Sequence, residues 1–299
     1  MNLKLSEINQ FDNLGLIAKQ LVDGFITGLH KSPYHGFSVE FAEHKLYNQG
    51  ESTRHIDWKV FARTDRLYTK QYEEETNLRC HILVDNSASM HYPAPDKDKL
   101  RFSVFGASAL SYLLTQQRDA VGLSIFSNTI EEETQVKSTQ SHLNLLLGKL
   151  AKLSTQEPNT STNISDVLHE IAQKIHRRSL VVIFSDMFQN ANEDGLLNAL
   201  QHLKHNKHEV ILFHVSDHES ELNFEFEDRP YKFVDIETNE VVKVNPREVK
   251  KEYKSEMVAF YQNLKIKCGL MKIDFVPVNT SDSFDKILGA YLIKRKRMK

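Results

Sequence analysis

The chain has 299 residues, 40% of them hydrophobic and 26% charged, and a formal net charge of −2 at pH 7. This composition is ordinary for a globular protein with a sizeable core, and the near-neutral charge argues against a nucleic-acid partner. No apolar run reaches the length of about 18 residues that suggests a membrane span, and the first residues lack the apolar core of a signal peptide. The two cysteines, Cys80 and Cys268, are expected to be buried free thiols. We therefore expect a cytoplasmic protein with no stable membrane insertion.

Residues 1–77 are predicted to form an extension of the main domain. Within them, residues 10–30 place apolar side chains at steps of three and four, which predicts an amphipathic helix. Residues 36–72 are partly alternating and rich in aromatic residues and threonine, which predicts short strands and loops. The extension is thus expected to be a helix followed by short strands.

From residue 79 the sequence alternates between apolar strands and longer segments with helical periodicity. The runs CHILVD, AVGLSIFS, SLVVIFSD and EVILFHVSD are apolar almost throughout, as in the strands of a parallel sheet that is covered on both faces. Helices are predicted between these strands, at residues 99–117, 141–153 and about 164–176, with one more before EVILFHVSD.

This alternation is interrupted by an insertion at about residues 218–245, in which residues 231–245 predict a β-hairpin. Pro246 suits the first position of the helix that follows. A charged helix, a strand and a last helix complete the domain, at about residues 246–266, 272–279 and 282–295. We therefore predict an α/β fold for residues 78–299, a doubly wound, mostly parallel, Rossmann-like sheet with an inserted hairpin.

Polar side chains gather where two of the predicted strands end and where one helix begins. They are Asp85, Ser87 and Ser89, then Asp186, and then Thr160, Ser161 and Thr162. Helix capping explains any one of these groups, but ligands bind at the carboxyl ends of the strands in such a sheet, where all three groups are expected to meet. Two carboxylates and several hydroxyls suit a hard cation such as Mg²⁺ rather than zinc or copper. They would leave one coordination position open.

The same pattern resembles the metal-ion-dependent adhesion site of von Willebrand factor type A domains. The stretches DNSASM, STN and FSD carry this resemblance, which consists of Asp-x-Ser-x-Ser, a threonine and a further aspartate. The ligands that the resemblance implies are Ser87, Ser89 and Thr162, with Asp85 and Asp186 acting largely through water. Thr160 is the alternative to Thr162. The resemblance also implies that an acidic side chain of a partner protein fills the open position.

A longer segment is similar to a bacterial family known as domain of unknown function fifty-eight. The residues that match its signature are Tyr47, Gly50, Glu51, Arg54, Ile56, Asp57, Trp58, Ala62 and Arg63. Glu51 departs from the aspartate that is usual in the family. The similarity extends to FVDIETNEVVKVNP and LGAYLIKRK, and so covers nearly the whole chain. Members are commonly associated with AAA+ ATPases of the MoxR type, which implies such a partner and a chaperone-like role in maturation or assembly.

The leading functional hypothesis is a magnesium-dependent protein-interaction module that works with such an ATPase and has no catalytic residue of its own. One alternative is a metal-dependent hydrolase acting on a phosphate ester, because oxygen-bound magnesium also serves phosphoryl transfer. Against this, the sequence has no Walker, His-Glu-x-x-His or Gly-x-Ser-x-Gly motif. The other alternative is a scaffold with a degenerate metal site.

One charged cluster of the extension allows two interpretations. Arg54, Asp57, Trp58 and Arg63 either form a buried ion pair and an aromatic anchor, or present a surface to a partner protein. The sequence does not decide between them.

Overall fold

The computed structural model describes residues 14–31, 44–46, 58–70, 78–93, 98–153, 164–187, 193–236 and 240–298. The chain divides into two compact units, the larger made of Met1–Gly28 with Leu78–Lys299 and the smaller of Leu29–Asn77. In the part of the chain that these ranges cover, no helix is both long enough and apolar enough to cross a membrane.

The smaller unit contains two short strands and a helix among its described residues. β1 (His44–Leu46) pairs antiparallel with β2 (Tyr68–Lys70), and α2 (Trp58–Thr64) lies between them in the sequence. The sequence predicts the short strands but not α2, because a helix of 7 residues is too short to show an apolar period.

The larger unit is built on a six-stranded sheet in the order β10-β7-β6-β3-β4-β5. All neighbours pair in parallel except β4 and β5, which are antiparallel. The strands are β3 (Arg79–Asp85), β4 (Ala120–Phe126), β5 (Ile130–Glu133), β6 (Leu180–Ser185), β7 (Glu209–Ser216) and β10 (Asp274–Asn279). The predicted α/β fold with a mostly parallel sheet is therefore confirmed. The sequence does not predict β5, because IEEE is neither an apolar run nor an alternating one.

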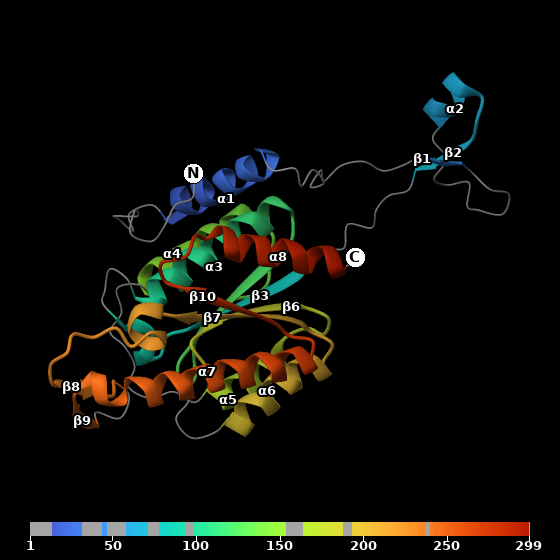
Figure 1. Ribbon diagram of the computed structural model, residues 1–299. Coiled ribbons are helices and arrows are strands. Elements are labelled where there is room, and N and C mark those ends of the chain that lie inside the picture. Colours follow the sequence, from blue (N-terminus) through green and yellow to red (C-terminus); the bar gives the residue numbers. More distant parts are fainter. Residues whose placement is uncertain are drawn as a thin grey trace. The chain divides into compact units, whose positions relative to one another are not determined.

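Helices cover both faces of this sheet (Figure 1). One face carries α3 (Lys99–Gln116), α4 (Gln140–Leu153) and α8 (Asp285–Met298), and the other carries α5 (Ile164–Lys174), α6 (Glu193–His205) and α7 (Pro246–Leu270). These confirm the predicted helices of the domain. α7 extends past its predicted end at residue 266, because Cys268 is buried one turn beyond the buried Leu264 and continues the same face.

α1 (Leu14–Lys31) confirms the helix predicted near the start of the chain. Its buried residues are Leu14, Ala18, Leu21 and Val22. These lie three or four positions apart, apart from the adjacent pair at the end, so they share one face of the helix.

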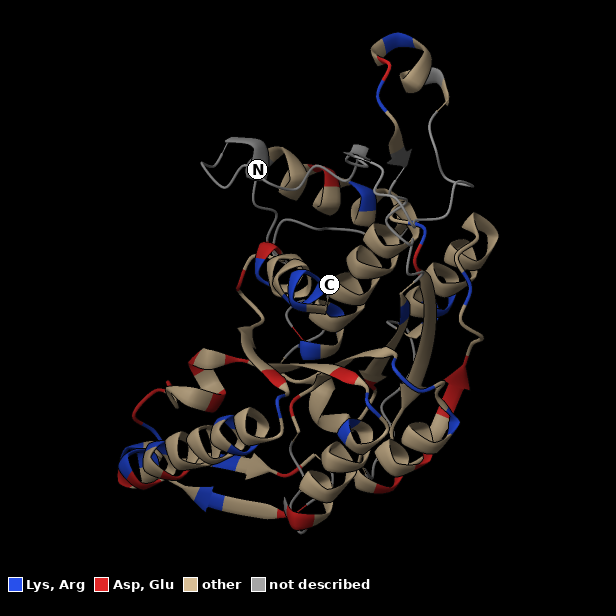
Figure 2. Cartoon of the chain, turned by 90° about the vertical axis from the view of Figure 1, so that its right-hand side faces the viewer, with Lys and Arg blue, Asp and Glu red and all other residues tan. Residues whose placement is uncertain are grey.

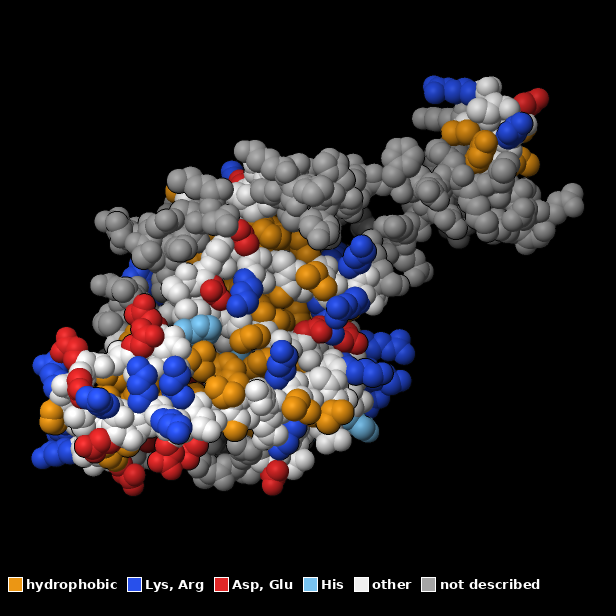
Figure 3. All heavy atoms as spheres, in the orientation of Figure 1, with side chains coloured by type: hydrophobic (Ala, Val, Ile, Leu, Met, Phe, Trp, Pro, Cys, Tyr) orange, Lys and Arg blue, Asp and Glu red, His pale blue; other side chains and the backbone are white. Residues whose placement is uncertain are grey.

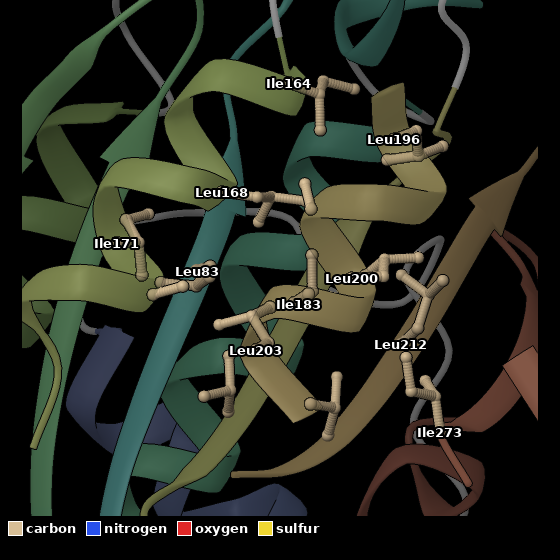
Figure 4. Packing of buried hydrophobic residues seen from close by; sticks show 14 of the residues in the cluster. Leu83, Ile164, Leu168, Ile171, Ile183, Leu196, Leu200, Leu203, Leu212 and Ile273 are labelled. Atoms are coloured by element: carbon tan, nitrogen blue, oxygen red, sulfur yellow. The ribbon is translucent and has the colours of Figure 1, made fainter. Parts of the chain in front are cut away.

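A core of buried aliphatic side chains fills the space between the sheet and the helices α5 and α6 (Figure 4). Leu83 and Ile183 reach into it from neighbouring strands, and Leu168 and Leu200 meet them from the two helices. Burying one such side chain contributes about 1.5–3 kcal/mol to folding. This packing fixes β3 and β6 side by side, and so fixes the loops that leave their carboxyl ends.

The predicted hairpin is also confirmed, as β8 (Tyr231–Val234) paired antiparallel with β9 (Val241–Val244). It follows a single π-helical turn, η4 (His218–Leu222), that comes directly after β7. Aromatic rings connect the segment after η4 to its neighbours. Phe224 lies 4.5 Å from Tyr253 of α7 between ring centroids, and Phe226 lies 5.2 Å from Phe233 of β8.

β10 is an outer strand of the sheet and contains Pro277, which pairs with His214 of β7. Proline has no N–H to donate, so it is tolerated where only one side of the strand is paired. Most residues of β10 are only half-buried, and apolar side chains are visible in the area where β10 passes between α7 and α8 (Figure 3).

Lys and Arg are interspersed with Asp and Glu over most of the described helices, whereas the last turn of α8 is basic, with Arg295, Lys296 and Arg297 (Figure 2). Cys80 and Cys268 are buried and free, as predicted. Burial raises the pKa of the Cys80 thiol far above its usual value, which keeps this thiol protonated and unreactive.

Candidate metal centre at the carboxyl edge of the sheet

Three neighbouring parallel strands end at the same edge of the sheet. β3 ends at Asp85, β6 at Ser185 and β7 at Ser216. The register aligns Val84 with Phe184, so Asp85 and Ser185 come next to each other at this edge. Chain segments about 100 residues apart in the sequence therefore meet there, as the parallel topology predicts.

Asp85 is fully buried and held by hydrogen bonds to both of its oxygen atoms. Its Oδ1 accepts from the backbone N–H of Ser87 at 2.9 Å, and its Oδ2 accepts from the hydroxyl of Ser185 at 2.6 Å. The Ser185 oxygen in turn accepts from the N–H of Met187 at 2.9 Å. These bonds fix the orientation of the carboxylate and join the two strand ends.

Ser87 and Ser89 place their hydroxyl oxygens 3.0 Å apart. Ser87 is the N-cap residue of a short helix, η3 (Ala88–His91), but its side chain makes no capping hydrogen bond. The capping interpretation therefore does not account for this hydroxyl. Ala88 and Met90, between and after the two serines, are buried and anchor the turn.

The loop after β3 is also attached to the strand that the sequence does not predict. Asn86 donates from Nδ2 to a carboxylate oxygen of Glu131 in β5 at 3.0 Å, and its Oδ1 lies 3.1 Å from Nε2 of His91. Hydrogen bonds to both sides of the amide restrict the loop, so Ser87 and Ser89 have a defined direction relative to the sheet.

Asp186, directly after β6, is 2% exposed and pairs with a buried lysine. Nζ of Lys99, the first residue of α3, lies 2.8 Å from Oδ2 of Asp186. Lys99 also donates to Glu221 of η4. Sequence reasoning missed Lys99 and Glu221. One signal was available, because a lysine at the first position of a helix is unfavourable to the helix dipole and needs another reason to be there.

The buried charges perturb one another. Burial, and then the like charge of Asp186, raise the pKa of Asp85 to about 7. Burial also raises the pKa of Glu221, although Lys99 opposes this. Burial acts to lower the pKa of Lys99, but the carboxylates of Asp186 and Glu221 outweigh it and the pKa rises. Asp186 and Glu221 thus flank one ammonium, and Asp85 lies close to Asp186, so ionisation of all three carboxyl groups leaves an excess of negative charge for a cation to neutralise.

The donor set fits a hard cation. Asp85, Ser87, Ser89 and Asp186 offer only oxygen atoms, which Mg²⁺ and Ca²⁺ prefer. Among the described residues, no group of three or more His, Cys, Asp or Glu side chains is arranged to hold a metal ion, so serine hydroxyls are essential to this set. Thr162 and its alternative Thr160 lie outside the described residues.

The predicted partner surface belongs to the smaller unit. Arg54 and Asp57 lie outside the described residues, whereas Trp58 and Arg63 are part of α2. Trp58 is 63% exposed and contacts the ring of Phe61 edge-on, and Arg63 is exposed as well. Within the smaller unit Trp58 is thus an exposed side chain, which is compatible both with an anchor that docks on the sheet domain and with a surface for a partner protein.

Comparison with known proteins finds one matching family and distant relatives. The family described as "Protein of unknown function DUF58" matches residues 43–261. Uncharacterized proteins of Mycobacterium bovis and Mycobacterium tuberculosis are 26% identical over 204 residues, which is 68% of this chain and 63% of theirs. The match therefore spans less than two thirds of these curated relatives.

Two solved structures resemble the chain at low identity. The conserved hypothetical protein BatB from Bacteroides thetaiotaomicron is 16% identical, with a TM-score of 0.45. An aerotolerance-related membrane protein from Bacteroides fragilis is 14% identical, with a TM-score of 0.46. Each likeness covers 73% of this chain and 99% of the other. Likenesses at this level assign no activity to the chain.

Proposed function

The chain belongs to the family Protein of unknown function DUF58, and we propose that it is a magnesium-dependent protein-interaction module. In this proposal the larger unit is a von Willebrand factor type A-like domain. The module works with a MoxR-type AAA+ ATPase in the maturation or assembly of client proteins.

The observation that carries the proposal is the pairing of two serine hydroxyls with two buried aspartates at one edge of the sheet. Ser87 and Ser89 face each other at 3.0 Å instead of capping a helix, and Asp85 is oriented by Ser185. A purely structural role would not require like charges to be buried together, because that arrangement costs free energy.

The chain's own residues would divide the work between them. The hydroxyls of Ser87 and Ser89, with Thr162, would contact the cation, while Asp85 and Asp186 would orient its bound water. Because neutral hydroxyls leave much of the charge on the cation, a bound Mg²⁺ would supply an open position that attracts a carboxylate of the partner. Such a site binds without a general base or a nucleophile.

Calorimetric titration with Mg²⁺ tests the metal site. We expect binding to the wild type, a loss of at least about tenfold in affinity for Asp85→Ala, and unchanged binding for Asp228→Ala, which removes an exposed carboxylate of the same unit. Equal binding by the wild type and Asp85→Ala would refute the site. Phosphatase turnover that Asp85→Ala abolishes would favour a hydrolase instead.

Affinity capture tests the partner. The wild-type protein is used as bait once with Mg²⁺ and once with a chelator. We expect an AAA+ ATPase to be recovered with Mg²⁺ and lost with the chelator. Recovery of the ATPase in equal amounts under both conditions would contradict a metal-dependent interaction.

A further inference from the structure

The most unusual side chain near the candidate metal centre is a buried cation. Lys99 is 1% exposed, and its ammonium lies between the carboxylates of Asp186 and Glu221. A lysine is rarely buried this deeply unless it is paired, and here it is paired with a residue that is predicted to serve the metal.

Glu221 is itself fixed from the other side. Its Oε2 accepts from the backbone N–H of Asp217 at 2.8 Å. Asp217 is the N-cap residue of η4. Its carboxylate accepts from the N–H of Ser220 at 3.0 Å and lies 3.4 Å from the hydroxyl of Thr280, just after β10. The Glu221 carboxylate, which is the second partner of Lys99, is therefore held in place by the loops that follow β7 and β10.

We propose that Lys99 is the resident counter-ion of the metal centre, and that a divalent cation binds by displacing its ammonium from Asp186, so that Glu221 becomes the only charged partner of the ammonium. This inference rests on the proposed function and adds a means of regulating that site. Lys99 acts here as a positioning residue, because it would affect the metal through Asp186 and would not contact it.

Electrostatic repulsion between the two cations favours this displacement. Oδ2 of Asp186 already accepts from Lys99 at 2.8 Å, and a divalent cation near the same carboxylate would repel an ammonium at that distance. Glu221 offers the ammonium a position in which it remains paired. Removing Lys99 without replacing its charge would leave several buried carboxyl groups unneutralised, and such a group needs a cation.

The exchange would connect the metal to a distant part of the chain. Glu221 belongs to η4, and Phe224 in the segment after η4 stacks on Phe233 of β8 in the hairpin. A shift of the ammonium onto Glu221 strengthens the contact between α3 and η4. Metal binding would therefore stabilise η4, and a partner protein that moves η4 away would lower the affinity of the site for the metal.

Two variants of the full chain should move the Mg²⁺ affinity in opposite directions. We expect Lys99→Met to bind Mg²⁺ at least about tenfold more tightly than the wild type, because no resident cation competes. We expect Glu221→Gln to bind several-fold more weakly, because the ammonium then has only Asp186 as a charged partner. Lys286→Met, which removes a half-exposed lysine paired with Asp282, is the control and should leave the affinity unchanged.

Folding is checked by circular dichroism with and without Mg²⁺. If Lys99→Met does not fold, Lys99→Arg and Glu221→Gln keep the test decisive, since the arginine retains the charge and should not bind more tightly than the wild type. If the wild type binds Mg²⁺, two outcomes would overturn this inference and leave the proposed function intact. One is a folded Lys99→Met that binds Mg²⁺ no more tightly than the wild type, and the other is a Glu221→Gln that binds it more tightly. Binding by Lys99→Met but not by the wild type would overturn the proposed function and the displacement with it, and would leave Lys99 as a permanent counter-ion of Asp186. Absence of binding in both would overturn both.

Discussion

One buried aspartate lies at the carboxyl edge of the main sheet, where the strands end, and another lies at the amino edge, where they begin. The surroundings of the two residues differ. At the carboxyl edge, Asp85 receives its hydrogen bonds from a hydroxyl and a backbone N–H and lies close to a second carboxyl group. At the amino edge, Asp119 precedes β4 and is 1% exposed. It accepts from the N–H of Leu78 at 3.2 Å and from both terminal nitrogens of the Arg295 guanidinium.

This difference separates a structural acid from a candidate ligand. Asp119 has a cation of its own, and Tyr291 and Gln117 complete the network around that cation. Asp85 faces a like charge, and the nearest ammonium is bound to Asp186 and Glu221 instead. Burial of an acid alone is therefore no sign of function. Acids crowded together beside two serine hydroxyls that contact each other are a much better sign.

The largest expected effect comes from breaking the structural pair. Arg295→Met leaves the carboxylate of Asp119, whose side chain is 2% exposed, without its counter-ion, and we expect a loss of about 3 kcal/mol in the free energy of unfolding. Urea denaturation at neutral pH measures this. Arg297→Met is the matched control, because its side chain is 69% exposed and its ion pair with Asp274 should contribute no more than about 1 kcal/mol. Equal losses in the two variants would show that Asp119 does not depend on its partner.

The next effect is a dependence of the stability on pH, which we expect from the buried His81 in β3. Burial, and then the positive charges of His208 and Arg79, lower the pKa of His81 from 6.5 to about 4. The unfolded chain binds a proton at this histidine below about pH 6.5, while the folded chain does so only near pH 4. Unfolding therefore takes up a proton in this range, and stability falls as the pH is lowered from 6.5 to 4.

The size of this response can be measured by difference. One buried histidine with this shift accounts for at most about 3 kcal/mol at pH 4. We expect the unfolding free energy of His81→Gln to fall less steeply with decreasing pH than that of the wild type, in urea titrations between pH 4.5 and 6.5. Parallel curves for the two proteins would contradict the assignment to His81.

Much of the sheet could be predicted from the sequence because its signal is local. β3, β6 and β7 each contain an almost continuous apolar run, which is typical of strands buried on both faces of a parallel sheet. β5 could not be predicted in the same way. It is a half-exposed outer strand whose only apolar residue is Ile130, and it exists through its pairing with β4.

Some residues of the candidate site could likewise be predicted from the sequence and others could not. Asp85 and Asp186 could be placed at one edge because the carboxyl ends of parallel strands meet at the same edge of a sheet. Lys99 and Glu221 could not, since their contacts join residues 87 and 122 positions apart. No spacing rule relates a lysine at the start of α3 to a turn after β7. Only the folded chain shows that the predicted acids already have a cation.

The smallest expected change in stability is that of Asp85→Asn, which compares the acid at the carboxyl edge most directly with Asp119 at the amino edge. Asp85→Asn removes a negative charge that is buried next to Asp186 and keeps a side chain of nearly the same shape. At pH 8, without divalent cations, we expect this variant to be about 1 kcal/mol more stable than the wild type, because relief of the like charge outweighs the imperfect pairing of the amide. Adding Mg²⁺ should stabilise the wild type and leave Asp85→Asn unchanged, which thermal denaturation of both proteins measures. A loss of about 3 kcal/mol, as expected for Arg295→Met, would mean instead that Asp85 is a structural acid like Asp119.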